Sequence, residues 1–134
     1  MALVKKRRLW FPCLGIGILF LIANCGDDTT GPRELLDKYF SSALKQEYGT
    51  TYTCYYGAYQ AKVSREEFIR HRQKASLLQS YKVKSLRLLS SDTATAEVQL
   101  TFGPSEQLKR PVPVTVMVKE ELIKENGAWK IKVW

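Results

Sequence analysis

A chain of 134 residues, 45% apolar and 25% charged, is long enough for one domain and has a globular composition, which excludes wholesale disorder. The formal charge of +8 suggests nucleic-acid binding at first, but four of the 21 basic residues lie in residues 1–24, which contain no acid. The remainder holds 17 basic and 13 acidic residues, a net charge of +4, so a nucleic-acid partner is not expected. Three cysteines and one histidine without close spacing argue against a zinc site, and we expect no cofactor.

The first 24 residues have the layout of a secretory signal peptide. Residues 5–8 are all basic, and residues 9–23 form an almost continuous apolar run. That run is shorter than the roughly 20 residues that a membrane-spanning helix needs. Because the positive charges stay in the cytoplasm, we expect the rest of the chain to be exported.

The signal ends in Leu21-Ile22-Ala23-Asn24-Cys25, which resembles the lipobox of bacterial lipoproteins, with Asn24 in place of the usual Gly, Ala or Ser. The resemblance implies that Cys25 receives diacylglycerol and becomes the first mature residue after cleavage between Asn24 and Cys25. Two or three acyl chains attach a protein stably, since each buried CH₂ contributes about 0.8 kcal/mol. We therefore expect anchoring to a bacterial membrane, facing the periplasm or the cell exterior. The alternatives are ordinary cleavage nearby and an uncleaved anchor.

Residues 25–32 are polar and turn-rich, and we expect them to be a lipidated cysteine followed by a tether. Seven extended residues after the cysteine reach roughly 25 Å, which holds a small domain clear of the headgroups. The domain then covers residues 33–134. Its one cysteine, Cys54, has no intrachain partner and is expected to be a buried small side chain, with pairing to another chain as the alternative.

Three helices are predicted in the first half of this domain. The first begins at Pro32 and stops at Gly49, because apolar residues recur between them at helical spacing. The third begins at Ser64, where Ser-Arg-Glu-Glu forms a capping box, and continues to Ala75. The second lies between them and is indicated by tyrosines three and four residues apart: Tyr48, Tyr52, Tyr55, Tyr56 and Tyr59.

Four strands are predicted after Gln79, where the apolar period changes. They cover residues 81–89, residues 93–102, a segment that begins at Val112, and residues 129–133. Apolar and polar residues alternate strictly over 93–102, which is typical of an antiparallel sheet with one buried face. Asn126-Gly127 predicts a hairpin turn into the last strand. Helices followed by antiparallel strands indicate an α+β fold.

This order of elements resembles the nuclear transport factor two-like superfamily, also called the cone fold or the ketosteroid isomerase/polyketide cyclase-like fold. The resemblance covers residues 33–134 and rests on the tyrosine-rich helix and on residues 44–49, 64–68, 92–98 and 125–131. It implies helices packed on a curved antiparallel sheet of about four strands, with a conical cavity between them. Many bacterial lipoproteins carry one such domain without a known activity.

Enzymes of this family place an Asp, His or Tyr inside the cone, but no general base is evident at the inward positions of the strand over 93–102 or of the last strand. Glu120 has the parity of the neighbouring valines and is expected toward the strand end, at a bulge or the rim. The spacing of His71 from Phe68 and Ala75 allows it to face inward, but a lone histidine between Arg70 and Arg72 is more often a surface or hydrogen-bonded side chain. We therefore assign no catalytic residue. The candidate lining of the cavity is Tyr52, Tyr55, Tyr59, His71, Val98, Leu100, Phe102 and Trp129.

The tyrosines and a group of basic residues each have a second interpretation. The tyrosine stripe also suits plain core packing, because a helix lying on a sheet needs an apolar face. The basic residues are expected on a solvated face, with anionic lipid headgroups or an acidic envelope polymer as the alternative partner: Arg65, Arg70, Arg72, Lys74, Lys82 and Lys84.

The sequence thus favours a non-enzymatic envelope lipoprotein whose domain binds a protein partner or a small apolar ligand. A second copy of the chain, bound through the sheet, is one such partner. The alternative is a small cavity enzyme of the isomerase, dehydratase or cyclase type that uses His71 or Glu120 with a tyrosine. The two functions differ in whether either side chain points into a closed pocket near a tyrosine hydroxyl.

Overall fold

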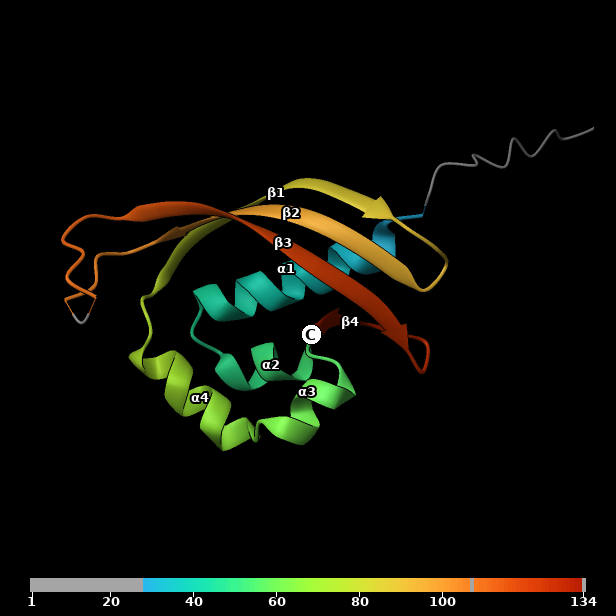
Figure 1. Ribbon diagram of the computed structural model, residues 1–134, viewed down its shortest axis with the longest axis horizontal. Helices are drawn as coiled ribbons and strands as arrows, with labels where there is room; N and C mark the ends of the chain where they lie inside the picture. Colours follow the sequence, from blue (N-terminus) through green and yellow to red (C-terminus); the bar gives the residue numbers. More distant parts are fainter. Residues whose placement is uncertain (1–27, 107, 134) are drawn as a thin grey trace, which may run out of the picture.

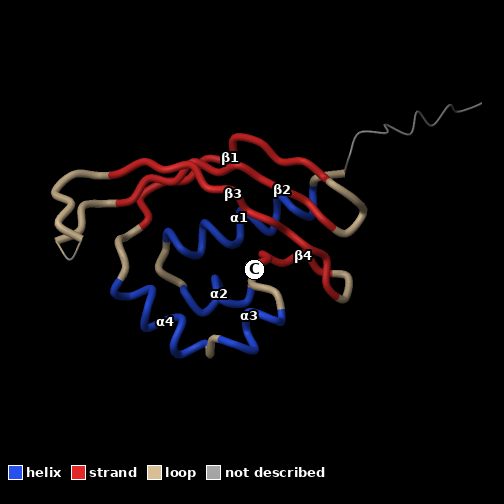
Figure 2. The backbone as a smooth tube through the Cα atoms, viewed as in Figure 1, coloured by secondary structure: helices blue, strands red, loops and turns tan. Residues whose placement is uncertain are grey.

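The computed structural model describes residues 28–106 and 108–133, so the predicted signal peptide and Cys25 lie outside the described residues. Four helices come first and four strands follow: α1 (Thr30–Leu44), α2 (Tyr48–Thr53), α3 (Gly57–Lys62), α4 (Arg65–Lys74), β1 (Leu78–Leu88), β2 (Thr93–Phe102), β3 (Val114–Glu125) and β4 (Ala128–Lys132). The strands form one antiparallel sheet in the order β1-β2-β3-β4. The sheet curves over α1, and the shorter helices lie beyond α1 (Figures 1 and 2). This confirms the α+β prediction.

The first helix forms because its apolar residues share one face, and α1 buries Leu35, Leu36, Tyr39 and Phe40. It begins at Thr30, so residues 30–32 belong to the helix and not to the tether expected over residues 25–32. The predicted stop at Gly49 is also wrong. The helix ends at Leu44, and Gln46 adopts a φ of 59° and turns the chain toward α2.

The single tyrosine-rich helix predicted here is two helices in the structure. Between α2 and α3 the backbone forms hydrogen bonds with β4: the Ile131 N–H donates to the Cys54 carbonyl at 2.7 Å, and the Tyr56 N–H donates to the Ile131 carbonyl at 3.0 Å. Residues 54–56 therefore form a bridge to the last strand. Cys54 lies 1% exposed beside it, as expected for a buried thiol.

The capping box at the start of α4 is confirmed in part. The Ser64 hydroxyl accepts a hydrogen bond from the Glu67 N–H at 3.2 Å, so the helix begins where the sequence predicts. Phe68 is buried on the inner face of α4, and the helix ends at Lys74, one residue before the predicted end.

The sheet follows the predicted pattern most closely in β2, where Ala94, Ala96, Val98 and Leu100 are all buried. The first strand begins at Leu78, earlier than expected, and two register shifts along it account for its imperfect alternation. The third strand begins at Val114 instead of Val112, since the prolines at 111 and 113 have no N–H to donate.

The β3–β4 turn is the hairpin that the sequence predicts. Asn126 and Gly127 both have positive φ, 50° and 80°, as a two-residue turn of this hand requires. The core lies between α1 and the concave face of the sheet, and its most deeply buried side chains include Leu36, Leu122 and Ile131. No helix in residues 28–106 and 108–133 combines the length and the hydropathy needed to cross a bilayer.

Candidate functional site

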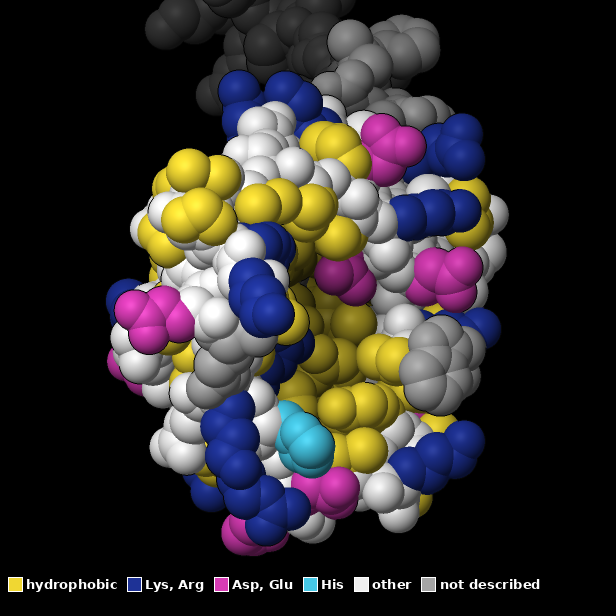
Figure 3. Space-filling model, turned by 60° about the vertical axis from the view of Figure 1, so that its left-hand side comes forward, with side chains coloured by type: hydrophobic (Ala, Val, Ile, Leu, Met, Phe, Trp, Pro, Cys, Tyr) yellow, Lys and Arg dark blue, Asp and Glu magenta, His cyan; other side chains and the backbone are white. Residues whose placement is uncertain are grey.

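A cavity of about 140 Å³ lies between α1, α4 and the sheet. Its apolar walls are Phe40, Ala43, Ala75, Leu78, Leu100 and Phe102. Its polar lining is Tyr39, Tyr48, Arg72, Ser76 and Glu120. One face of the molecule is hollowed, with a hydrophobic floor and charged side chains around the opening (Figure 3).

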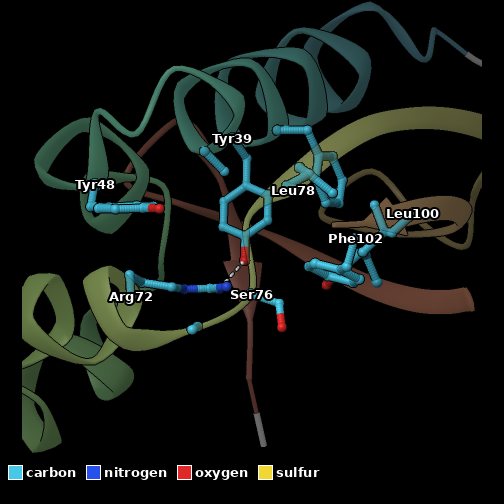
Figure 4. Close-up of a pocket in the computed structure, with 11 residues that line it drawn as sticks. Tyr39, Tyr48, Arg72, Ser76, Leu78, Leu100 and Phe102 are labelled. Atoms are coloured by element: carbon cyan, nitrogen blue, oxygen red, sulfur yellow. Dashed lines mark hydrogen bonds between the residues drawn. The ribbon is translucent and has the colours of Figure 1, made fainter. Parts of the chain in front are cut away.

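Arg72 carries the positive charge of this cavity. Its Nη2 donates to the hydroxyls of Tyr39 and Tyr55, both at 3.1 Å, and the two hydroxyl oxygens are 2.6 Å apart. Figure 4 shows the guanidinium reaching across the cavity to the Tyr39 hydroxyl. The guanidinium carbon also lies 5.3 Å from the centroid of the Phe68 ring, in cation–π range. These contacts hold Arg72 in one orientation.

The hydrogen-bond partners of Arg72 are neutral. Burial raises the pKa of the Tyr39 hydroxyl well above its ordinary value, so this side chain keeps its proton at physiological pH. Among the described residues, no carboxylate lies within 4.0 Å of the guanidinium. A cation in this position is usually paired with an anion, because removing an unpaired charge from water is costly. The positive charge of Arg72 is therefore available to interact with a ligand in the cavity.

Glu120 supplies the carboxyl group among the side chains that line the cavity. It pairs with Ala96 in the middle of the β2–β3 ladder and lines the cavity, so the expected place at a bulge or the strand end is wrong. The third strand simply continues to Glu125, which places Glu120 well inside it. Burial raises the pKa of Glu120 to about 7, although the Arg72 charge acts in the opposite direction. Glu120 therefore changes charge near neutral pH.

His71 does not reach this cavity. Its side chain is 71% exposed and its Nε2 lies 3.7 Å from the Glu67 carboxylate, one helical turn earlier. Phe68 and Arg72 are the residues of α4 that turn inward, because positions four apart share a helix face. The inward placement of His71 is thus wrong, and it lines only a shallow depression outside, together with Tyr59.

The other residues expected to line the cavity are spread over three places. Leu100 and Phe102 do line it. Tyr55 lies one layer behind, where its hydroxyl supports Arg72 and Tyr39. The remaining three do not line the cavity, so the prediction is wrong for them. Val98 is fully buried in the core, and the Tyr52 hydroxyl donates to the Val63 carbonyl at 2.6 Å. Trp129 packs over Gly31 at the start of α1.

Arg72 is the candidate site residue that the sequence does not single out. The sequence places it with a basic surface, and five of the six members of that group are indeed exposed: Arg65, Arg70, Lys74, Lys82 and Lys84. The signal that separates Arg72 from them is its spacing of four residues after Phe68, the apolar anchor of the same helix.

Neither the protein-family models nor the curated proteins contain a match to the chain. A SEC-C motif protein from Rhodopseudomonas palustris superposes with a TM-score of 0.64 at 10% identity, over 77% of this chain and 76% of that one. A ketosteroid isomerase-like protein from Erwinia carotovora atroseptica gives 0.55 at 14% identity, over 79% and 92%. A nuclear transport factor two-like protein of unknown function from Shewanella oneidensis gives 0.54 at 12% identity, over 77% and 93%.

These similarities establish the fold alone, because all three identities are low. The domain has the nuclear transport factor two-like cone fold that the sequence resemblance implied. The function has to be argued from the cavity itself.

Proposed function

We propose that this protein is an exported envelope lipoprotein, anchored through Cys25, whose cone domain binds a small ligand and does not catalyse a reaction. The observation that carries the binding function is the preformed cavity, with six apolar residues in its walls and the Arg72 cluster at its polar end. An engineered apolar cavity of about 150 Å³ accepts benzene, so a cavity of about 140 Å³ suits a ligand of similar size. Benzene has six non-hydrogen atoms, so the expected ligand is a small molecule on this scale.

The anchor is supported by the sequence of the leader and by where the fold begins. Four residues separate Cys25 from the first residue of α1, Thr30. Fully extended, they span roughly 15 Å, less than the tether expected from the sequence. A protein lipidated at Cys25 would therefore hold its domain close to the membrane surface.

Replacing Cys25 with Ala is expected to abolish incorporation of a fatty-acid analogue and to release the protein from the membrane fraction. Two acyl chains or more account for the attachment in this proposal, and the variant has no thiol to carry them. Cys54→Ala is the matched control, and it should still be labelled because Cys54 is buried in the domain. If Cys25→Ala stays with the membrane, the leader is an uncleaved anchor and the lipoprotein proposal is wrong.

Ligand binding is tested with three compounds of nearly equal size and different charge: benzoate, benzyl alcohol and benzylamine. At least one of them, in large excess over its Kd, should raise the Tm of the full chain in detergent by about 5 °C or more. Ala43→Phe fills the cavity from α1 and should remove this shift. The control is Ala58→Phe, which adds the same ring at an exposed site on α3. An identical shift in wild type and Ala43→Phe would place binding outside the cavity.

A cavity enzyme is the second candidate, and the position of Glu120 favours it. A carboxylate with a pKa of about 7 is suited to abstract a proton at neutral pH, and Tyr39 lies in the same cavity. His71 contributes nothing to this candidate because it faces solvent. In an enzyme, Glu120→Gln would abolish conversion of a bound compound while binding persists. In the proposed binding protein, no bound compound is converted by the wild type.

A protein partner, including a second copy bound through the sheet, stays a prediction from the sequence. The sheet face opposite the helices offers Met117, which is 54% exposed, among polar neighbours such as Thr101 and Thr115. That face has the composition of an ordinary solvated surface. The cavity is therefore the better-supported site.

A further inference from the structure

We infer that the ligand of this cavity carries a carboxylate, which the Arg72 guanidinium receives at the polar end while an apolar body fills the rest. This inference rests on the proposed binding function and names the chemical class of the ligand. It is argued from the unused donors of Arg72, from the shape of the apolar wall, and from the charges that face the cavity.

The first argument is the coordination of Arg72. A guanidinium has five N–H donors, and in Arg72 the two tyrosine hydroxyls are both bound by Nη2. The tyrosines therefore fix the plane of the group and leave its other nitrogens for a further acceptor. Since no carboxylate of the described residues lies within 4.0 Å, Arg72 forms no direct ion pair with them. The remaining N–H groups, on Nη1 and Nε, can each give a ligand carboxylate one charge-assisted hydrogen bond, which is stronger than a hydrogen bond to a neutral acceptor.

The wall of the cavity opposite the polar cluster is apolar. Phe40, Leu100 and Phe102 line the cavity from α1 and β2, and none of them offers a side-chain hydrogen bond. Leu78, also in the wall, comes from the edge strand β1 (Figure 4). A ligand that binds Arg72 at one end and contacts the apolar wall at the other is a short apolar acid, such as an aromatic or branched aliphatic carboxylate. A fully polar anion such as phosphate would leave the apolar wall without contacts.

The net charge of the cavity depends on whether Glu120 is ionised, because an ionised Glu120 would favour a cationic ligand. The groups that face Glu120 across the cavity are Arg72 from α4, Tyr39 from α1 and Tyr48 from α2, and only Arg72 is charged. Arg72 keeps its charge at every physiological pH. Glu120 is half-buried and loses much of its charge below neutral pH. The cavity is thus net positive when Glu120 is protonated, and its carboxyl proton becomes a second donor to the ligand.

Affinity for a carboxylate should therefore fall as the pH rises from about 6 to about 8. Protonated Glu120 donates to the ligand, whereas ionised Glu120 repels it. Glu120→Gln keeps a donor and removes the titration. In this variant the affinity for the carboxylate should be the same at both pH values.

The experiment is calorimetric titration of the full chain in detergent with benzoate, benzyl alcohol and benzylamine. Benzoate should bind about tenfold more tightly than benzyl alcohol near pH 6, as expected for a charge-assisted hydrogen bond. Arg72→Gln should lose about this factor for benzoate and little for benzyl alcohol. Arg70→Gln, an exposed site two residues away, is the matched control and should change neither affinity.

Three outcomes separate this inference from the proposed function. If benzyl alcohol binds as tightly as benzoate and Arg72→Gln changes neither, the carboxylate class is wrong and the cavity-binding function stands. If benzylamine binds most tightly and Glu120→Gln loses it, the site selects cations and the inference is also overturned. If none of the three compounds binds more tightly to wild type than to Ala43→Phe, the proposed function itself fails. Should Arg72→Gln fail to fold, Glu120→Gln still decides, because a pH-dependence of benzoate binding that survives in it contradicts the mechanism.

Discussion

Replacing Glu120 with Gln is expected to stabilise the domain by up to about 3 kcal/mol at about pH 8, and to have little effect at about pH 4. The reason is that burial raises the pKa of this carboxyl to about 7, compared with 4.5 for a solvated glutamate. Above neutral pH the folded protein must hold a charged carboxylate in a largely buried place. Glutamine has nearly the same shape and no charge, so it avoids this cost.

The sign of the pH dependence follows from proton linkage. Between about pH 4.5 and pH 7 the folded state holds a proton on Glu120 that the unfolded state has already lost. The contribution of Glu120 to stability therefore falls as the pH rises through this window, and it is restored when the pH is lowered. Urea unfolding of wild type and Glu120→Gln at a series of pH values measures this difference directly.

Glu121→Gln is the matched control, since the neighbouring side chain is exposed on the other face of β3. It removes the same charge at the next position and should not produce the pH-dependent gain. If Glu120→Gln and Glu121→Gln show the same pH profile, Glu120 is solvated and does not line a buried cavity.

Replacing Leu36 with Ala is expected to lower the free energy of unfolding by about 3–5 kcal/mol. Leu36 lies on α1 with no exposed surface, in one cluster with Leu122 and Ile131 from the two last strands. Truncation removes three buried carbon atoms and leaves a cavity that the surrounding sheet and helix fill only in part. Since small domains have total stabilities of about 5–15 kcal/mol, much of the folded population would be lost on modest warming.

The control for this prediction is Leu89→Ala. Leu89 follows β1 in the turn toward β2 and is 59% exposed, so its truncation should change stability by less than about 1 kcal/mol. Both values come from urea or thermal unfolding monitored by circular dichroism. A loss below about 1 kcal/mol for Leu36→Ala would mean that α1 does not pack against the sheet as described.

Glu120 is expected to lower the stability of the fold at the place where the domain has its cavity. The inward positions of β2 are all apolar, and on the facing strand β3 Glu120 interrupts the same pattern beside Ala96. A leucine or valine there would stabilise the fold, so the carboxyl costs stability where the domain has its cavity. Breaks of this kind in an otherwise consistent pattern are expected at functional sites.

Much of the fold could be predicted because its signals are local. The apolar face of α1, the Ser64 cap, the alternation in β2 and the Asn126-Gly127 turn each depend on residues a few positions apart. The division of the tyrosine-rich segment could not be predicted in this way. It depends on hydrogen bonds between residues 54–56 and Ile131, more than 70 positions later in the chain.

The same distinction applies to the candidate site. The cone fold could be predicted from the sequence alone, because it rests on the order of segments. The export signal and the lipidation of Cys25 are also predictions from the sequence, each from a pattern within one segment. The tertiary structure alone decided that Arg72 and Glu120 share one cavity while His71 faces water. Parity and helical spacing show which side chains of one helix or strand share a face. Only the packing of α4 against α2, with the cavity between α4, α1 and the sheet, determines which of those faces points inward.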